Sequence, residues 1–289
     1  MMSYNKKAEY IWMNGEFMPW EEAWVHSMSH GLHYGTAVFE GERAYGSKIF
    51  KSIEHSERFH RSAEMLDMTV DYSPQELHEI KMELLAKNGL TDAYIRPIAW
   101  RNVENLSVAS HQCSVNVAIA AWKWGNYFGN VNVFESGLKL AWADWIRPSP
   151  EMAPVAAKAS GLYIIGSLSK NKAEKAGFHD ALMLDYRGYV AECTGANFFM
   201  VEGGKIHTPT ADCFLNGITR RSVIEIARSK KIPVIERHIW PDEVNFADEV
   251  FITGTAVEVC PIGQIAERTF KVGEITTMIA AEYAAWVRR

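Results

Sequence analysis

Lys158 is the residue around which the chemistry of this chain can be arranged. It lies in the segment AAKASGLY (residues 156–163), where its small neighbours would let a flat molecule approach its amine closely. A lysine amine can bond covalently to a carbonyl compound and can afterwards transfer a proton. Pro148, Pro150 and Pro154 keep the preceding stretch extended. Taken alone, a lysine is more commonly a surface residue whose stem packs on apolar atoms.

Three further features could hold a phosphate group. Residues 215–219 form a glycine turn that leads into a helix, where the first N–H groups are unpaired and the dipole is positive. The turn at residues 254–256 follows an apolar strand and offers N–H groups and a hydroxyl. Arg58, on a short helix, could make a bidentate contact with a phosphate. Each feature also has an ordinary interpretation, as a helix start, a turn or a solvated arginine.

Glu192 is the best candidate for a carboxylate that binds a ring nitrogen. It ends a predicted strand in VAECTG (residues 190–195), where small residues would let a ring approach. A lysine, a phosphate site and such a carboxylate together suggest pyridoxal phosphate, with a Schiff base on Lys158 and a pyridine nitrogen kept protonated by the acid. The alternative interpretation of Glu192 is an exposed residue at the end of a strand.

The elements that must position these residues are strands and helices in a mixed order. The residue patterns predict strands at 10–13, 16–18, 36–45, 93–101, 114–122, 138–145, 181–185, 189–192, 197–201, 205–208, 233–239 and 250–253. They predict helices at 56–66, 74–88, 162–176, 219–230 and 275–287. The stretch 125–137 has no clear period and is interpreted as a linker between a small N-terminal domain (1–124) and a larger C-terminal domain (138–289).

Composition excludes several classes of protein. The net charge is −5 and no Lys/Arg run exceeds two residues, which argues against a nucleic-acid or anionic-membrane surface. The four cysteines form no CxxC and no histidine cluster has metal-ligand spacing, so we expect no metal site. With no apolar leader and no run of 18 apolar residues, we expect a cytoplasmic protein with reduced thiols.

Seven ordered segments carry a resemblance to a known family. They are YIWMNG (10–15), MSHGLHYGT (28–36), VFEG (38–41), AYIRP (93–97), AAKA (156–159), GITR (217–220) and GTA (254–256). Over nearly its whole length the chain resembles the fold-type IV (class IV) pyridoxal-phosphate aminotransferases, and most closely the bacterial branched-chain amino acid aminotransferases. The resemblance implies an α/β (α+β) fold with a small N-terminal α/β domain and a larger C-terminal pseudo-barrel domain. It also implies a homodimer or higher oligomer, in which the partner subunit helps to close the pocket.

The same resemblance implies a role for each cofactor residue. Lys158 would be the Schiff-base lysine and general acid/base, and Glu192 would pair with the pyridine nitrogen. Tyr163 would bind the ring 3-hydroxyl and Leu215 would pack against the ring. Arg58, the backbone of Ile218 and Thr219, and Thr255 would hold the phosphate.

The substrate residues are implied in the same way. The Thr255 and Ala256 amides, with the Tyr94 hydroxyl, would receive the substrate α-carboxylate. Phe39, Trp124 and Tyr127 would line an apolar side-chain pocket, with Tyr34 and Arg96 at its edge. In the family, Arg96 and its neighbours let the pocket also accept the distal carboxylate of glutamate. The implied reaction moves the amino group of leucine, isoleucine or valine to 2-oxoglutarate.

Two departures from the family leave other functions open. The loop after the Tyr-x-Arg-Pro strand (residues 103–110) has no glycine and is shorter than usual, which bears on substrate range. Ala196 stands where many relatives carry a glutamate. An aminotransferase for (R)-amines or D-amino acids is the main alternative. An aminodeoxychorismate-type lyase and a non-catalytic cofactor binder are more distant ones.

Overall fold

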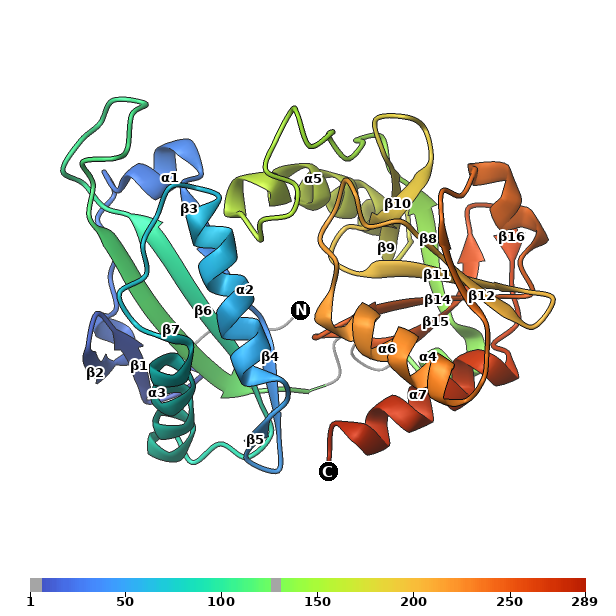
Figure 1. Ribbon diagram of the computed structural model, residues 1–289, viewed down its shortest axis with the longest axis horizontal. Coiled ribbons are helices and arrows are strands. Elements are labelled where there is room, and N and C mark those ends of the chain that lie inside the picture. The colour runs from blue at the N-terminus through green and yellow to red at the C-terminus, as the bar shows by residue number, and fades with distance from the viewer. Residues whose placement is uncertain (1–6, 126–130) are drawn as a thin grey trace. The chain divides into compact units, whose positions relative to one another are not determined.

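A computed structural model describes residues 7–125 and 131–289 (Figure 1). Its residues fall into two compact units: the first contains the described residues up to Gly125 together with Ala157–Gly161 and Arg288, and the second contains the rest. Lys158 therefore packs with the first unit, although the chain on either side of it belongs to the second. Residues 126–130 of the expected linker lie outside the described residues. A short helix, α4 (Val133–Ser136), occupies part of the remainder, where no element was predicted.

Among these residues, the first unit is built on a seven-stranded sheet. The predicted hairpin is confirmed, with Asn14 and Gly15 in the turn at positive φ, as such a tight turn requires. β6 and β7 form the longest antiparallel pair of the sheet. The sheet runs in the order β2-β1-β7-β6-β4-β5, and β3 also pairs with β6. Its strands are β1 (Tyr10–Met13), β2 (Glu16–Pro19), β3 (Ala37–Phe39), β4 (Glu42–Tyr45), β5 (Lys48–Ile49), β6 (Ala93–Arg101) and β7 (Val115–Lys123).

Two longer helices cover one face of this sheet, α2 (Ser52–Glu64) and α3 (Pro74–Lys87). α3 begins as predicted, because Ser73 and Glu76 form a capping box and proline occupies the first helical position. α2 begins four residues before the predicted start. The buried residues of its first turn, Ser52 and His55, are polar. The spacing of apolar residues therefore gave no signal for this turn. Two short helices, η1 (Trp20–Glu22) and α1 (His30–Tyr34), complete the unit.

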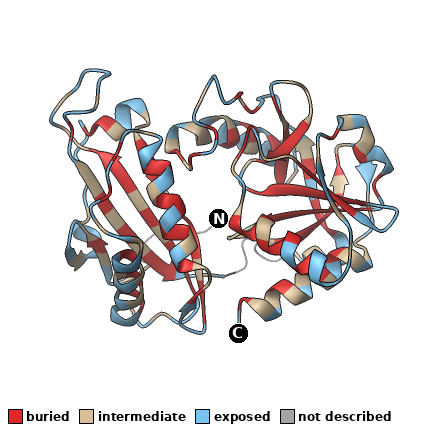
Figure 2. Cartoon of the chain, in the orientation of Figure 1, coloured by how far each residue is buried: buried red, intermediate tan, exposed pale blue. Residues whose placement is uncertain are grey.

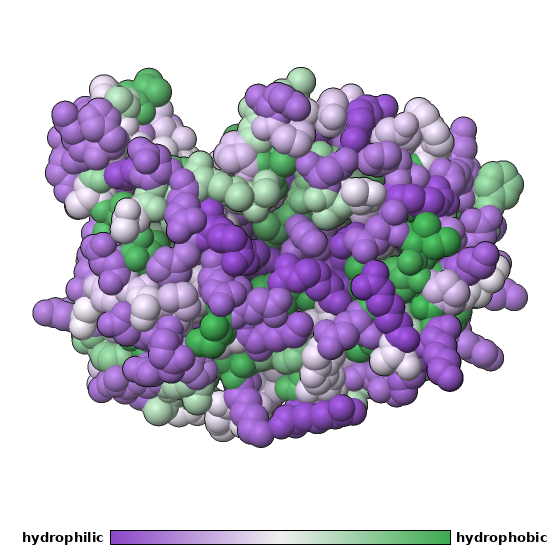
Figure 3. Space-filling view, viewed as in Figure 1, coloured by the Kyte–Doolittle hydropathy of each residue, from purple (hydrophilic) through white to green (hydrophobic). Residues whose placement is uncertain are grey.

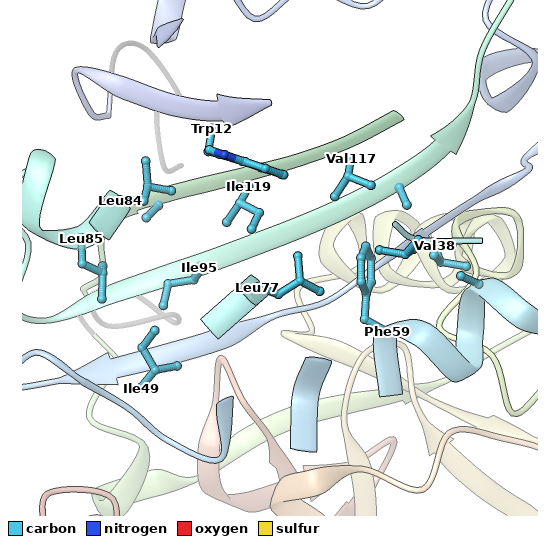
Figure 4. Packing of buried hydrophobic residues seen from close by; sticks show 14 of the residues in the cluster. Trp12, Val38, Ile49, Phe59, Leu77, Leu84, Leu85, Ile95, Val117 and Ile119 are labelled. Carbon is cyan, nitrogen blue, oxygen red and sulfur yellow. The ribbon is translucent and has the colours of Figure 1, made fainter. Parts of the chain in front are cut away.

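Apolar side chains from both helices meet those of the sheet in one core (Figure 4). Phe59 from α2 and Leu77 and Leu84 from α3 are fully buried against Trp12 and Ile119 of the sheet. The buried positions along these elements are coloured red in Figure 2. This packing fixes α2 on the sheet and with it the polar side chains that α2 carries.

Lys81 forms an ion pair inside the same core. Its amine donates to both carboxylate oxygens of Glu42, at 2.8 and 2.9 Å, and to the Ser56 hydroxyl at 2.8 Å. We expect Lys81→Met to lower the free energy of unfolding by about 3–5 kcal/mol, because Glu42 would stay buried without a partner. Urea denaturation measures this loss. The double variant Lys81→Met/Glu42→Leu should recover most of it, and a single variant as stable as the wild type would contradict the prediction.

The second unit, as far as the structure describes it, holds a nine-stranded sheet. Its order is β10-β9-β8-β15-β14-β11-β12-β13, with β16 paired to β15, and the further pairing of β10 with β11 closes six of the strands into a barrel. Alternate side chains fill the barrel interior with apolar residues. The strands are β8 (Leu138–Trp142), β9 (Asp180–Leu184), β10 (Val190–Cys193), β11 (Asn197–Glu202), β12 (Lys205–Pro209), β13 (Val234–Arg237), β14 (Glu249–Gly254), β15 (Glu258–Ile265) and β16 (Arg268–Thr269).

Three helices of this unit match the predicted ones within a residue or so at each end. They are α5 (Tyr163–Lys175), α6 (Ile218–Ser229) and α7 (Glu274–Trp286). Two 3-10 turns, η2 (Ser160–Leu162) and η3 (Pro241–Phe246), precede α5 and β14. No helix among the described residues is long and apolar enough to cross a membrane.

β15 was not predicted and β8 ends three residues earlier than expected. Pro261 and Gly263 interrupt β15 and argue against a strand in the sequence. Tertiary contacts explain Gly263, since a Cβ there would come within 1.8 Å of the Ser136 carbonyl oxygen. The backbone of Gly137 packs on Gly263 at the same place, so the glycine admits a close approach of two segments.

Candidate functional site

The backbone of Lys158 is fastened to the first unit on both sides. Its amide N–H donates to the Ser62 hydroxyl of α2 at 3.0 Å, and its carbonyl accepts from the Phe39 amide at 3.1 Å. Ala157 and Ala159 are buried, while Lys158 itself is half-buried. Ala157 and Ala159 are the small neighbours that were predicted to let a molecule approach the amine. Their small size also lets this segment pack closely within the first unit. The lysine amine lies 4.8 Å from the centre of the Phe39 ring.

Four of the predicted substrate residues come together in this unit. The Arg96 guanidinium lies 4.8 Å from the centre of the Phe39 ring, and its Nη2 donates to the Tyr94 hydroxyl at 3.0 Å. The Tyr94 ring stacks on Trp124 with 4.5 Å between ring centres. Gly41 leaves the space that the Tyr94 hydroxyl fills, since a Cβ at Gly41 would lie 2.0 Å from that oxygen. The result is an apolar wall that carries the Arg96 guanidinium and the Tyr94 hydroxyl.

Tyr34 is held against the loop that follows β6. Its hydroxyl donates to the Leu106 carbonyl at 3.0 Å, and its ring packs on His30. His30 is fully buried and bonds the Ser107 carbonyl through Nε2 at 2.9 Å. The loop that departs from the family pattern is therefore fastened at Leu106 and Ser107. Tyr127, the remaining predicted residue of the apolar pocket, lies outside the described residues.

Arg58 is buried and paired, which differs from the solvated arginine that its sequence context allowed. Its Nε donates to Glu40 Oε1 at 2.6 Å, and its Nη2 donates to Glu40 Oε2 at 2.8 Å. His55 Nδ1 lies 2.8 Å from the same Oε2. Burial opposes a charge on Glu40, but attraction and hydrogen bonds from Arg58, with a smaller contribution from His55, hold the pKa of Glu40 well below its usual range.

This depressed pKa predicts an acid dependence of stability. An unfolded glutamate has a pKa of about 4.3, so the Glu40 pairing contributes fully above that pH and is lost as the pH falls toward the lower folded-state pKa. Below about pH 4 the unfolded chain binds a proton here and the folded chain does not. Because of this difference, the free energy of unfolding decreases more steeply as the pH is lowered. The added slope is at most about 1.4 kcal/mol per pH unit.

Glu40→Gln lacks this titration and should show a shallower slope. Urea denaturation of the wild type and the variant at several pH values between about 5 and 3 measures both slopes. Because all other carboxylates remain, the difference between the slopes isolates Glu40. Equal slopes would contradict a charged Glu40 in the folded protein.

Glu192 is buried at the end of β10 in the second unit, whereas an isolated strand-end glutamate is usually exposed. Its Oε1 lies 3.5 Å from Arg147 Nε, and its Oε2 accepts from the Asn197 amide at 3.1 Å. The same Asn197 nitrogen donates to the Leu215 carbonyl at 3.0 Å. Asn197 thus connects the carboxylate to the turn that the sequence assigned to the cofactor ring.

The start of α6 has the features of an anion site. Gly217 is the N-cap residue and no side chain caps the helix. A Cβ at Gly217 would lie 2.2 Å from Asn197 Oδ1, so only glycine fits beside this side chain. Ile218 and Thr219 follow as buried first-turn residues, and the Thr219 hydroxyl lies 3.5 Å from the Tyr283 hydroxyl. The N–H groups of this turn have no side-chain partner from the cap position.

The other predicted residues of the second unit lie at the ends of elements. Tyr163 is the first residue of α5 and is half-buried. Thr255 and Ala256 form the predicted turn after β14 and are also half-buried. Ala196 is buried in the turn before β11, and its carbonyl accepts from the Cys193 amide.

One group in the described chain has the spacing of a metal site: Asp185, Asp212 and Cys213. The Arg187 guanidinium donates to both carboxylates, at 2.6–2.9 Å. These hydrogen bonds to Asp212 and Asp185 raise the pKa of Arg187. Burial raises the pKa of the Cys213 thiol to about 12. The two carboxylates of this cluster are therefore paired with Arg187.

Five residues around these sites escaped the sequence interpretation: Glu40, His55, Ser62, Arg147 and Asn197. Glu40 carried a usable signal, because an acid between Phe39 and Gly41 in an otherwise apolar stretch needs a partner if it is buried. The partners of Arg147 and Asn197 lie 45 and 5 positions away, at Glu192. Neither spacing indicates a contact on its own.

Comparison with known proteins places the chain in a family. The profile described as "Amino-transferase class IV" matches residues 37–265. A probable branched-chain-amino-acid aminotransferase of Rickettsia bellii is 41% identical over 283 residues, covering 96% of each chain. The branched-chain-amino-acid aminotransferase of Escherichia coli K12 is 40% identical over 266 residues, covering 90% of this chain and 86% of that one. The crystal structure of the branched-chain aminotransferase from the thermophilic archaeon Thermoproteus uzoniensis with norvaline matches with a TM-score of 0.92 and 37% identity, covering 97% of this chain and 95% of that one.

Proposed function

Because the chain belongs to the class IV aminotransferase family, we propose that it transfers the amino group of a branched-chain L-amino acid to 2-oxoglutarate with pyridoxal 5'-phosphate as cofactor. The observation that carries this function is the identity of about 40% over nearly the whole chain with branched-chain aminotransferases. The sequence predicted the same family, activity and cofactor. Its substrates are small amino acids and 2-oxo acids.

The residues present fit pyridoxal phosphate. A half-buried lysine lies between two buried alanines, and the buried Arg58 provides a cation for a phosphate. In the second unit a buried carboxylate lies close to a helix start whose cap position is occupied by glycine. When bound, pyridoxal phosphate supplies an electron sink that lowers the barrier to losing the substrate Cα proton.

In the first unit we assign Lys158 as the covalent attachment point of the cofactor and as the base that moves the proton at Cα. Hydrogen bonds from the Lys158 backbone to Ser62 and Phe39 fix the position of its Cα and so limit the volume that the amine can reach. This restriction favours proton transfer on one side of the substrate Cα. Arg58 binds phosphate. The Tyr94 hydroxyl binds the substrate carboxylate, and the Arg96 donation fixes the orientation of that hydroxyl.

The Phe39 and Trp124 rings supply the apolar wall for a branched side chain, with Tyr34 at its edge. The Arg96 cation beside Phe39 explains how glutamate could use the same wall, since its distal carboxylate would meet Arg96.

In the second unit we assign Glu192 as the carboxylate that would pair with the pyridine nitrogen. Asn197 donates a hydrogen bond to one oxygen of Glu192, and Arg147 forms an ion pair with the other. Tyr163 would bind the ring hydroxyl and Leu215 would pack against the ring. The backbone of Ile218 and Thr219 at the start of α6 would bind the phosphate together with Thr255, and the Thr255 and Ala256 amides would bind the substrate carboxylate.

We also propose a cytoplasmic homodimer. Four buried cysteines without disulfides suit a reducing compartment. Several large apolar side chains are more than two-thirds exposed, namely Trp24, Val108, Met152 and Phe246. Figure 3 shows hydrophobic groups interrupting a largely hydrophilic face. The support for a dimer is the family resemblance, and these exposed side chains are compatible with it. Sedimentation velocity of the holoenzyme tests the state, and a monomer at micromolar concentration would contradict it.

A half-reaction tests the function. The visible absorbance of the cofactor-loaded protein is followed after adding L-leucine, and in separate cuvettes D-alanine or (R)-1-phenylethylamine. We expect the band to disappear with L-leucine and to return with 2-oxoglutarate. Loss of the band only with the (R)- or D-donor would overturn the branched-chain assignment and would direct attention to the loop at residues 103–110.

A further inference from the structure

We propose that Glu40 is a positioning residue for cofactor binding: it orients the guanidinium of Arg58 so that a phosphate meets a prearranged cation. This inference rests on the proposed function, because it takes the phosphate-binding role of Arg58 from there. Nothing in the sequence patterns assigned a role to Glu40. The contacts of a fully buried carboxylate in the first unit carry it.

The geometry of the pair restricts how Arg58 can turn. Glu40 accepts from Nε and from Nη2, at 2.6 and 2.8 Å, so both bonds lie along one edge of the planar guanidinium. Two parallel bonds to one edge fix the plane of the group and direct its other edge away from Glu40. A phosphate that binds at the other edge meets an arginine whose rotamer is already chosen, which reduces the entropy lost on binding.

Glu40 is itself held by neighbours. His55 Nδ1 lies 2.8 Å from its Oε2, and the Gly41 amide donates to the same oxygen at 3.2 Å. The Glu40 amide donates to the Pro97 carbonyl of β6 at 2.8 Å. Glu40, His55 and Arg58 are all buried, with Glu40 at 0% and Arg58 at 7% exposure. These hydrogen bonds hold the Glu40 carboxylate in one orientation between the sheet and α2.

Helix α2 connects this arrangement to the lysine. Arg58 and Ser62 are four residues apart and lie on one side of the helix, and Ser62 accepts from the Lys158 amide at 3.0 Å. A single helix thus positions the phosphate-binding cation and the backbone of the reactive lysine. Displacing Arg58 should alter phosphate binding without changing the hydrogen bond between Ser62 and Lys158.

Glu42 provides a matched control two residues along the chain. It is as fully buried as Glu40 and also pairs with a buried cation, but its partner is Lys81 in the core. Glu40→Gln and Glu42→Gln each remove one buried carboxylate charge. Only the first disturbs Arg58, because a glutamine offers a single acceptor oxygen to the two N–H groups that the carboxylate now receives.

The experiment uses the full-length protein freed of cofactor, in a buffer without phosphate. Calorimetry measures its affinity for pyridoxamine 5'-phosphate and for pyridoxamine, which lacks the phosphate. The affinity for pyridoxamine 5'-phosphate divided by the affinity for pyridoxamine measures what the phosphate contributes to binding. Neither ligand has an aldehyde, so this ratio does not depend on covalent attachment to Lys158. We expect Glu40→Gln to lower this ratio about tenfold and Glu42→Gln to leave it unchanged. A ratio unchanged or raised in Glu40→Gln would overturn the proposal, as would an equal loss in Glu42→Gln.

Glu40→Asp keeps the test usable if Glu40→Gln does not fold. It retains the charge but shortens the side chain by one methylene, so it should also lower the ratio, by a smaller factor.

Arg58→Lys distinguishes this proposal from the proposed function. If Arg58→Lys leaves the ratio unchanged, the phosphate role of Arg58 fails. If Arg58→Lys lowers it and neither Glu40 variant does, the positioning role alone fails. In the double variant Arg58→Lys/Glu40→Gln, the Glu40 change should add no further loss.

Discussion

Replacing Lys158 by alanine should lower kcat/KM for L-leucine by about 10⁴-fold or more, because in the proposed function its amine both bonds the cofactor and moves the Cα proton. The fold should persist. Lys158 is half-buried, and the bonds that fasten its segment come from its backbone and not from its side chain. Steady-state kinetics measure the activity, and circular dichroism with thermal unfolding measures the fold.

The Lys158→Ala protein should still bind cofactor non-covalently, because its phosphate contacts do not use the lysine amine, and an added small primary amine should restore part of the proton transfer. Lys172→Ala is the matched control. Lys172 lies on α5, is 69% exposed and pairs with Asp144, so its loss should leave kcat near the wild-type value. Near-normal turnover by Lys158→Ala would remove this residue from the mechanism.

Glu192→Gln should lower the rate of Cα proton loss by about 10²–10³-fold, the range found when a prearranged electrostatic partner is removed from a reacting group. A neutral amide no longer stabilises a protonated ring nitrogen, so the ring withdraws electrons less strongly. A single-turnover reaction with L-leucine deuterated at Cα measures the step directly. An isotope effect larger than in the wild type would show that proton loss has become more rate-limiting.

The Arg147→Met variant shows how much of the rate loss in Glu192→Gln comes from breaking the ion pair with Arg147. Glu192→Gln leaves the Arg147 cation without its carboxylate, so part of any loss could come from structure. Arg147→Met keeps the carboxylate at the ring nitrogen and should reduce the rate much less. Glu202→Gln, at the exposed end of β11, should have no effect. A rate in Glu192→Gln equal to that of Glu202→Gln would contradict the proposed role.

Local sequence was sufficient for most of the elements. The Asn14-Gly15 hairpin and the capping box of α3 depend on residues a few positions apart, so their signals are complete within a short window. β15 was missed for the opposite reason. Pro261 and Gly263 weaken its local pattern, and only its pairing with β14, β8 and β16 shows that it is a strand.

The sequence alone determined the family and the activity, because these depend on ordered motifs that can be recognised without knowing their contacts, and the same motifs predict Lys158 as the reactive lysine. Only the tertiary structure decided the surroundings of the charged groups. Arg58 was compatible with a solvated residue until Glu40, 18 positions away, was found to bond it, and Glu192 was compatible with a surface glutamate until Arg147 and Asn197 were found beside it. The physical reason is that a buried charge is stable only with its partners, and those partners come from other elements, whose approach no local pattern encodes.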